Sequence, residues 1–137
     1  MNIGQLITYK QHLTVQTNPT TSPYEYIYYN SFVGGVQGAA SMYELDYWCT
    51  SGRDAIAYIN GVAEYGSSVG IVGGPTSIVN YYARDDLVLI MEIINLEDID
   101  YIVGCKRAVR DIERFIDLPI ISKVVVDEAV LAVIRGK

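Results

Sequence analysis

Helical and strand-like patterns alternate between residues 50 and 121, and this alternation restricts the fold more than any other feature of the sequence. Apolar residues recur at helical spacing within 50–65, where Thr50 or Ser51 can act as the N-cap, and a buried-strand pattern follows at 68–72. The next predicted elements are a short helix through Ala83, strands at 87–93 and 99–104, and a helix at 108–115. Strands separated by helices form βαβ units, so we expect a mainly parallel sheet covered on both faces.

The last part of the chain has a different pattern. Two apolar runs within 122–134 flank the acidic pair Asp127-Glu128, which is typical of a β-hairpin. We expect this hairpin to extend the sheet antiparallel at one edge. The predicted fold class is therefore α/β, with a small three-layer Rossmann-like, mainly parallel sheet and a C-terminal antiparallel hairpin.

Length and composition indicate one folded domain. The chain has 137 residues, of which 50% are hydrophobic and only 19% charged, so it can bury a core. Proline and small hydroxyl residues are concentrated at 16–23, which predicts an arm or linker at 1–22 before a single α/β domain at 23–137.

Charge and hydropathy exclude several classes of partner. The net charge is −6, without a long run of one sign, which argues against a nucleic-acid surface. No apolar stretch is long enough to cross a bilayer, and the first twenty residues lack a secretory leader pattern, so we expect the isolated chain to be soluble. Cys49 and Cys105 have no zinc-type spacing, and a packed, free thiol is the default for each, although spacing leaves open whether they meet.

A glycine-rich turn is the first candidate site. It lies between a predicted strand and a predicted helix, where backbone amides could hold an anion, and its residues are Gly73, Gly74, Thr76 and Ser77. The turn lacks the Gly-Lys-Thr/Ser of a Walker motif, and a proline interrupts the dinucleotide pattern at position 75. A structural turn is therefore favoured over phosphate or nucleotide binding.

Other polar residues give no clear site. His12 is the single histidine and lies in the predicted arm, so we expect neither a catalytic triad nor a metal site around it. The acidic clusters at 85–86 and 97–100 fall at predicted turns, and the arginines of 107–114 alternate with acids, as on a solvated helix face. We expect no cofactor and no metal.

Tyrosine is unusually frequent. The chain has twelve tyrosines, and six of them lie between Tyr24 and Tyr47, directly before Trp48. Amphipathic rings of this kind occur in packed cores, sugar sites, protein interfaces and membrane interfaces.

The same region carries a family resemblance. It reads Pro-Tyr-Glu-Tyr-Ile-Tyr-Tyr-Asn at 23–30, Val-Gly-Gly-Val-Gln-Gly-Ala at 33–39 and Tyr-Glu-Leu-Asp-Tyr-Trp-Cys-Thr-Ser at 43–51. This resembles the extracytoplasmic C-terminal domain that follows the last transmembrane helix in polytopic glycosyltransferases of the dolichyl-phosphate-mannose and aminoarabinose-transferase type. The family pattern has glycine after the tryptophan, where this chain has Cys49, so a tight turn there is altered. The resemblance extends less sharply over 23–135.

The resemblance implies a role without chemistry of its own. Members of the family transfer a sugar from a polyprenyl-phosphate donor to an acceptor outside the membrane, and their catalytic acid lies in an early loop that this sequence lacks. It implies a non-catalytic domain at the extracytoplasmic face of the membrane, with the transmembrane part of the same enzyme, the donor lipid and the acceptor as partners. The residues expected to contact them are Tyr28, Asn30, Glu44, Asp46, Tyr47 and Trp48.

Three alternatives stay open from the residues. Asn30 and Asp46 could only satisfy buried backbone groups. The chain could be a free-standing Rossmann-like module that binds a nucleotide or sugar phosphate at the 73–77 turn. It could also be an oligomerising domain that uses its aromatic residues as an interface.

Overall fold

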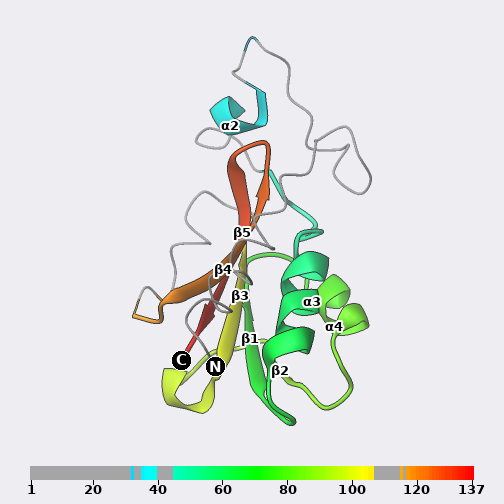
Figure 1. The fold of residues 1–137 in the computed structure, drawn as a ribbon, viewed down its shortest axis with the longest axis vertical. Helices are drawn as coiled ribbons and strands as arrows, with labels where there is room; N and C mark the ends of the chain where they lie inside the picture. The colour runs from blue at the N-terminus through cyan, green and yellow to red at the C-terminus, as the bar shows by residue number, and fades with distance from the viewer. Residues whose placement is uncertain (1–31, 33–34, 40–44, 107–114, 116) are drawn as a thin grey trace.

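The computed structural model describes residues 32, 35–39, 45–106, 115 and 117–137 (Figure 1). The predicted arm, the tyrosine-rich segment 24–30 and nearly all of the helix expected at 108–115 lie outside these residues. The described helices are α2 (Gly35–Ala39), α3 (Gly52–Val62), α4 (Ser77–Tyr82) and the short 3₁₀ helix η3 (Leu96–Asp98). The strands are β1 (Ser68–Val72), β2 (Val88–Ile90), β3 (Tyr101–Cys105), β4 (Ile120–Val126) and β5 (Ala129–Gly136).

The fold is α/β, built on one five-stranded sheet with the order β2-β1-β3-β5-β4. Strand β1 pairs parallel with both β2 and β3, as the alternating sequence pattern predicts. Strand β5 pairs antiparallel with β3 and with β4. The sheet is therefore mixed, and the expectation of a mainly parallel sheet holds only for its first three strands.

The predicted C-terminal hairpin is confirmed. Its turn consists of Asp127 and Glu128, whose φ angles of 47° and 63° lie in the left-handed region. Two consecutive residues with positive φ give a turn whose twist matches that of the flanking strands. The hairpin extends the sheet at one edge, and α2 lies near its tip, where the Asp127 carboxylate is 3.4 Å from the position of a Cβ on Gly35 (Figure 1).

The main core lies between the sheet and α3. Helix α3 buries Ala55, Ile56 and Ile59 toward the strands, in keeping with its helical apolar spacing. Helix α4 packs beside α3 on the same side of the molecule (Figure 1). Because side chains alternate between the two faces of a strand, neighbouring residues of β3 belong to different clusters. Val103 belongs to the main core, and Ile102 belongs to a second cluster.

The second cluster lies on the other face of the sheet. Val72, Ile99 and Ile102 form it, with partly buried neighbours that include Phe115 and Leu118. No helix among the described residues is long and apolar enough to span a membrane.

Candidate functional site

The turn before α3 contains three of the predicted contact residues. Asp46 is fully buried, and its carboxylate accepts hydrogen bonds from the backbone N–H of Thr50 (2.8 Å) and of Ser51 (3.1 Å). The hydroxyl of Ser51 also donates to this carboxylate. Ser51 is the N-cap residue of α3, one of the two predicted, but its side chain makes no cap bond to the helix backbone. Asp46 provides the anionic acceptor at the start of α3 instead.

A disulfide closes the same turn. Cys49 is bonded to Cys105 at the end of β3, with the two Cα atoms 5.5 Å apart. The expectation of a free thiol at each position is therefore wrong, and sequence spacing alone could not have shown the pairing. Cys49 has a φ of 55°, in the left-handed region that glycine adopts most easily.

Backbone hydrogen bonds connect the turn to the sheet. The Asp46 N–H donates to the carbonyl of Lys106 (3.3 Å), and the Lys106 N–H donates to the carbonyl of Leu131 in β5 (2.7 Å). Inside the turn, the Cys49 N–H donates to the Asp46 carbonyl (2.9 Å). The position of the turn is therefore fixed from β3 and β5 as well as from α3.

Two aromatic rings project from this fixed turn. Tyr47 is 42% exposed and Trp48 is 62% exposed, although both neighbours, Asp46 and Cys49, are fully buried. The rings contact each other edge to face, with centroids 5.1 Å apart and planes at 85°. The structure thus brings together Asp46, Tyr47 and Trp48, whereas Tyr28, Asn30 and Glu44 lie outside the described residues.

The predicted anion-binding turn lines a pocket. Gly73 and Gly74 have φ angles of 76° and 90°, and with Thr76 they border a cavity of about 430 Å³ at the carboxyl ends of β1 and β2. Ser77 is the first residue of α4 and does not line this cavity. Glu92 also lines it, and a carboxylate there disfavours an anionic ligand.

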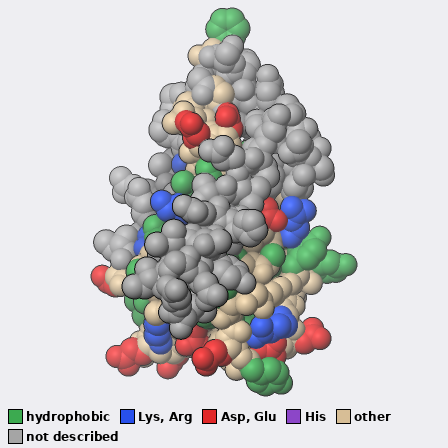
Figure 2. Space-filling model, viewed as in Figure 1, with side chains coloured by type: hydrophobic (Ala, Val, Ile, Leu, Met, Phe, Trp, Pro, Cys, Tyr) green, Lys and Arg blue, Asp and Glu red, His purple; other side chains and the backbone are tan. Residues whose placement is uncertain are grey.

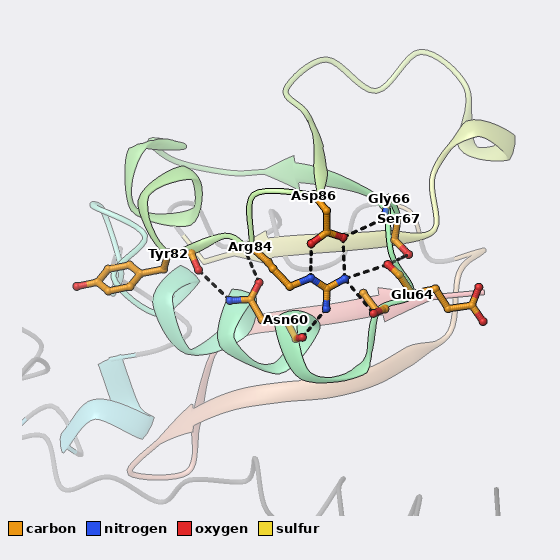
Figure 3. A network of polar contacts seen from close by, with 8 residues as sticks. Asn60, Glu64, Gly66, Ser67, Tyr82, Arg84 and Asp86 are labelled. Atoms are coloured by element: carbon orange, nitrogen blue, oxygen red, sulfur yellow. Dashed lines mark hydrogen bonds and ion pairs between the residues drawn. The ribbon is translucent and has the colours of Figure 1, made fainter.

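A polar network that was not predicted from the sequence holds the C-terminal end of α3 (Figure 3). The guanidinium of Arg84 donates to the carbonyls of Asn60 (2.8 Å), Ala63 (3.1 Å) and Glu64 (3.1 Å), at the last turn of the helix. The same group forms a two-point ion pair with Asp86. A basic group at a helix C-terminus is favourable, so Arg84 acts as a C-terminal clamp.

Asp86 completes this network, although the sequence predicts only a turn at this position. Its carboxylate also accepts the N–H of Gly66 (2.9 Å). The bond from Arg84, and then the bond from Gly66, lowers the pKa of Asp86 from 3.8 to about 2. The side chain of Asn60 joins α4 by donating to the Tyr82 carbonyl (2.8 Å). The spacing of Arg84 and Asp86, two residues apart, was the available sign of the ion pair.

The second acidic cluster is also tied into the structure. Asp100 accepts hydrogen bonds from the N–H (2.9 Å) and the hydroxyl (3.0 Å) of Ser68 at the start of β1. Burial, followed by the charges of Asp100 and Glu64, raises the pKa of Tyr101. Within the described part of the chain, no group of three or more His, Cys, Asp or Glu side chains could hold a metal ion.

Comparison with known proteins finds no match. The chain matches no family model, no curated protein and no solved structure.

Proposed function

We propose that this chain is a non-catalytic domain at the extracytoplasmic face of a membrane glycosyltransferase that uses polyprenyl-phosphate sugars. The domain would support the catalytic loops or position the acceptor. Its α/β fold would be a Rossmann-like three-layer unit. The observation that carries the proposal is the turn at 46–49, where a buried carboxylate and a disulfide hold two exposed aromatic rings.

The disulfide supports the proposed location. Disulfides persist in oxidising compartments and are rare in the cytosol, where thiols are kept reduced. Cys49 and Cys105 are both fully buried, as is typical of a structural disulfide rather than an exchanging one. An extracytoplasmic domain would have this bond formed during its folding.

The backbone at Cys49 supports the resemblance. The family pattern has glycine after the tryptophan, and position 49 adopts a φ of 55°, which is the conformation that favours glycine. A residue with a Cβ is strained in this conformation, and the bond to Cys105 holds it in place. The tight turn implied by the family pattern is thus compatible with cysteine at this position.

The proposal is tested on the native gene product. An antibody against this domain is used on membrane and soluble fractions of the source cells. A band several times larger than 15.2 kDa in the membrane fraction is expected. A band at 15.2 kDa in the soluble fraction would refute the proposal.

A second test addresses the aromatic pair. In the full-length enzyme, Trp48→Ala is expected to lower sugar transfer while the amount of folded enzyme stays unchanged. Tyr65→Ala is the matched control, because Tyr65 is 91% exposed and follows the opposite end of α3. Equal activity of both variants would remove Trp48 from the proposed contact.

The position of the pocket at the glycine turn supports a second candidate function, the binding of a nucleotide or a sugar phosphate by a Rossmann-like module, although the Glu92 carboxylate in the same pocket opposes an anionic ligand. The cavity lies outside the carboxyl ends of parallel strands, where α/β proteins commonly bind ligands. Thermal stabilisation by a nucleotide or a sugar phosphate, abolished by Gly74→Val, would favour this function. The absence of any shift with these ligands would count against it.

A further inference from the structure

The exposure of Tyr47 and Trp48 is fixed by the fold. Asp46 on one side and Cys49 on the other are fully buried, and the disulfide to Cys105 joins the turn to β3. The two rings therefore cannot withdraw into the core without breaking these bonds. Because the backbone that carries the rings is already fixed, docking them against a partner orders no further main chain.

The turn residues 47–51 include no charged side chain, although the chain is acidic and the adjoining Arg53 and Asp54 of α3 are partly exposed. Asp46 is the one acid between Leu45 and Gly52, and it is buried against the amides of α3. Figure 2 shows exposed Asp and Glu side chains along the lower end of the molecule, with others higher in the view. Within the turn itself, docking the two rings against an uncharged surface desolvates no exposed carboxylate, because Asp46 is buried.

The pair is too small to form a stable protein interface alone. A tryptophan or tyrosine offers about 150–250 Å² of surface, so rings that are 62% and 42% exposed supply on the order of 200 Å². A stable protein interface needs about 800 Å² from each partner. A lipid bilayer has no such requirement, because single tryptophan and tyrosine rings partition to its headgroup region.

We infer that Tyr47 and Trp48 insert into the headgroup region of a zwitterionic lipid bilayer and orient the domain on the membrane. This inference rests on the proposed function, which places the domain beside a bilayer. The apolar part of each ring would be buried among the upper acyl chains, and the indole N–H and phenol O–H would hydrogen-bond in the headgroup layer.

The single tryptophan of the chain makes a direct test possible. The chain is attached by an added N-terminal hexahistidine tag to phosphatidylcholine vesicles that contain a small fraction of nickel-chelating lipid. Tethering supplies the local concentration that a preceding transmembrane helix would give. We expect the emission of Trp48 to shift to the blue on tethering and to be quenched when the phosphatidylcholine is brominated on its upper acyl carbons.

A matched variant moves the reporter to the other end of α3. In Trp48→Phe/Tyr65→Trp, the tryptophan lies at a 91% exposed position beyond an 11-residue helix, about 16 Å farther along its axis. We expect neither a blue shift nor quenching at position 65. An unquenched Trp48, or equal quenching at both positions, would overturn the inference.

A second variant keeps the native reporter. Tyr47→Ser removes one ring of the pair and is expected to reduce the quenching of Trp48 by brominated lipid. Unchanged quenching would contradict the paired role of the two rings. Circular dichroism spectra that match those of the parent chain establish that each variant is folded.

The outcomes separate this inference from the proposed function. A large gene product in the membrane fraction, together with an unquenched Trp48, would keep the glycosyltransferase proposal and reject the bilayer contact. A 15.2 kDa product in the soluble fraction, together with specific quenching of Trp48, would reject the glycosyltransferase and keep a membrane-contacting surface.

Discussion

The two ends of α3 are held by the same kinds of interaction in opposite environments. At its start, the buried carboxylate of Asp46 accepts two backbone amides, and a buried disulfide closes the turn. At its end, Arg84 binds the final carbonyls and pairs with Asp86, but the Arg84 side chain is 35% exposed. One end of the helix is therefore anchored in the core, and the other by a partly buried ion pair whose Arg84 and Asp86 side chains are 35% and 10% exposed.

This difference determines how much each anchor contributes. When a buried acceptor is removed, the amides that donated to it are left without hydrogen bonds and away from water. When a partner at the surface is removed, water replaces it. The rigid end is also the end that carries Tyr47 and Trp48. A surface anchor could not hold two exposed rings in one orientation with equal precision. Four predictions test the comparison, from the largest expected effect to the smallest.

Removing the disulfide has the largest expected effect. The bond joins positions 56 apart, and a loop of that length corresponds to about 4 kcal/mol of stabilisation in the chain-entropy description. Cys49→Ala/Cys105→Ala is expected to lower the free energy of unfolding by about this amount, measured by urea denaturation. Retention of the parent stability would show that the turn is held without the bond.

Asp46→Ala is expected to lower the free energy of unfolding by about 3 kcal/mol, because two backbone amides and the Ser51 hydroxyl lose a buried anionic acceptor. Asp54→Ala is the control, since Asp54 lies in the first turn of α3 and pairs with a partly exposed Arg53. The control is expected to cost under about 1 kcal/mol. Similar urea midpoints for both variants would contradict the buried-anchor account.

Glycine substitutions compare the two ends of the helix directly. A Cβ on Gly52 would lie 2.8 Å from the side chain of Val79 and 3.1 Å from Cys49 Sγ, so Gly52→Ala is expected to destabilise by about 1–3 kcal/mol. A Cβ on Gly61 would contact nothing within 4 Å, and Gly61→Ala is expected to stabilise by about 0.5 kcal/mol through helix propensity. The change in stability of both variants is measured by thermal unfolding. A stabilising Gly52→Ala would show that the start of α3 is loosely packed.

Acid titration gives the smallest expected effect. The pKa of Asp86 is lowered to about 2 in the folded chain, so its contribution to stability is complete above its ordinary value of 3.8 and declines as the pH falls toward 2. Asp86→Asn is expected to flatten the decline in unfolding free energy across this window, measured by urea denaturation at each pH. The same slope in parent and variant would show that Asp86 is not coupled to folding.

The sequence predicted the helices and strands of the fold better than the pairing of the strands. Periodicity and turn chemistry located α3, β1, α4 and the C-terminal hairpin, because each is defined by residues close together in the chain. The pairing of β5 with β3 was predicted only as an antiparallel extension at one edge, since the partner strand depends on tertiary packing.

The candidate site depends still more on distant residues. The sequence indicated Asp46 and Trp48 through a family resemblance and Ser51 as a possible helix cap, but not that the Asp46 carboxylate is the acceptor at the start of α3. The partner of Cys49 lies at the end of β3, and the carbonyls that Arg84 binds lie at the end of α3 and in the two residues after it. Neither contact has a local sequence pattern, because only the assembled sheet and helices bring these segments together.

The most direct test of the account is the redox state of Cys49 and Cys105 in intact source cells. The cells are quenched in acid, and the protein from these cells is unfolded in denaturant and treated with a maleimide reagent of high mass before and after reduction. We predict that neither cysteine reacts before reduction and that both react after it, as expected for a disulfide-closed turn in an oxidising compartment. Two reactive thiols without reduction would contradict both the closed turn and the extracytoplasmic location.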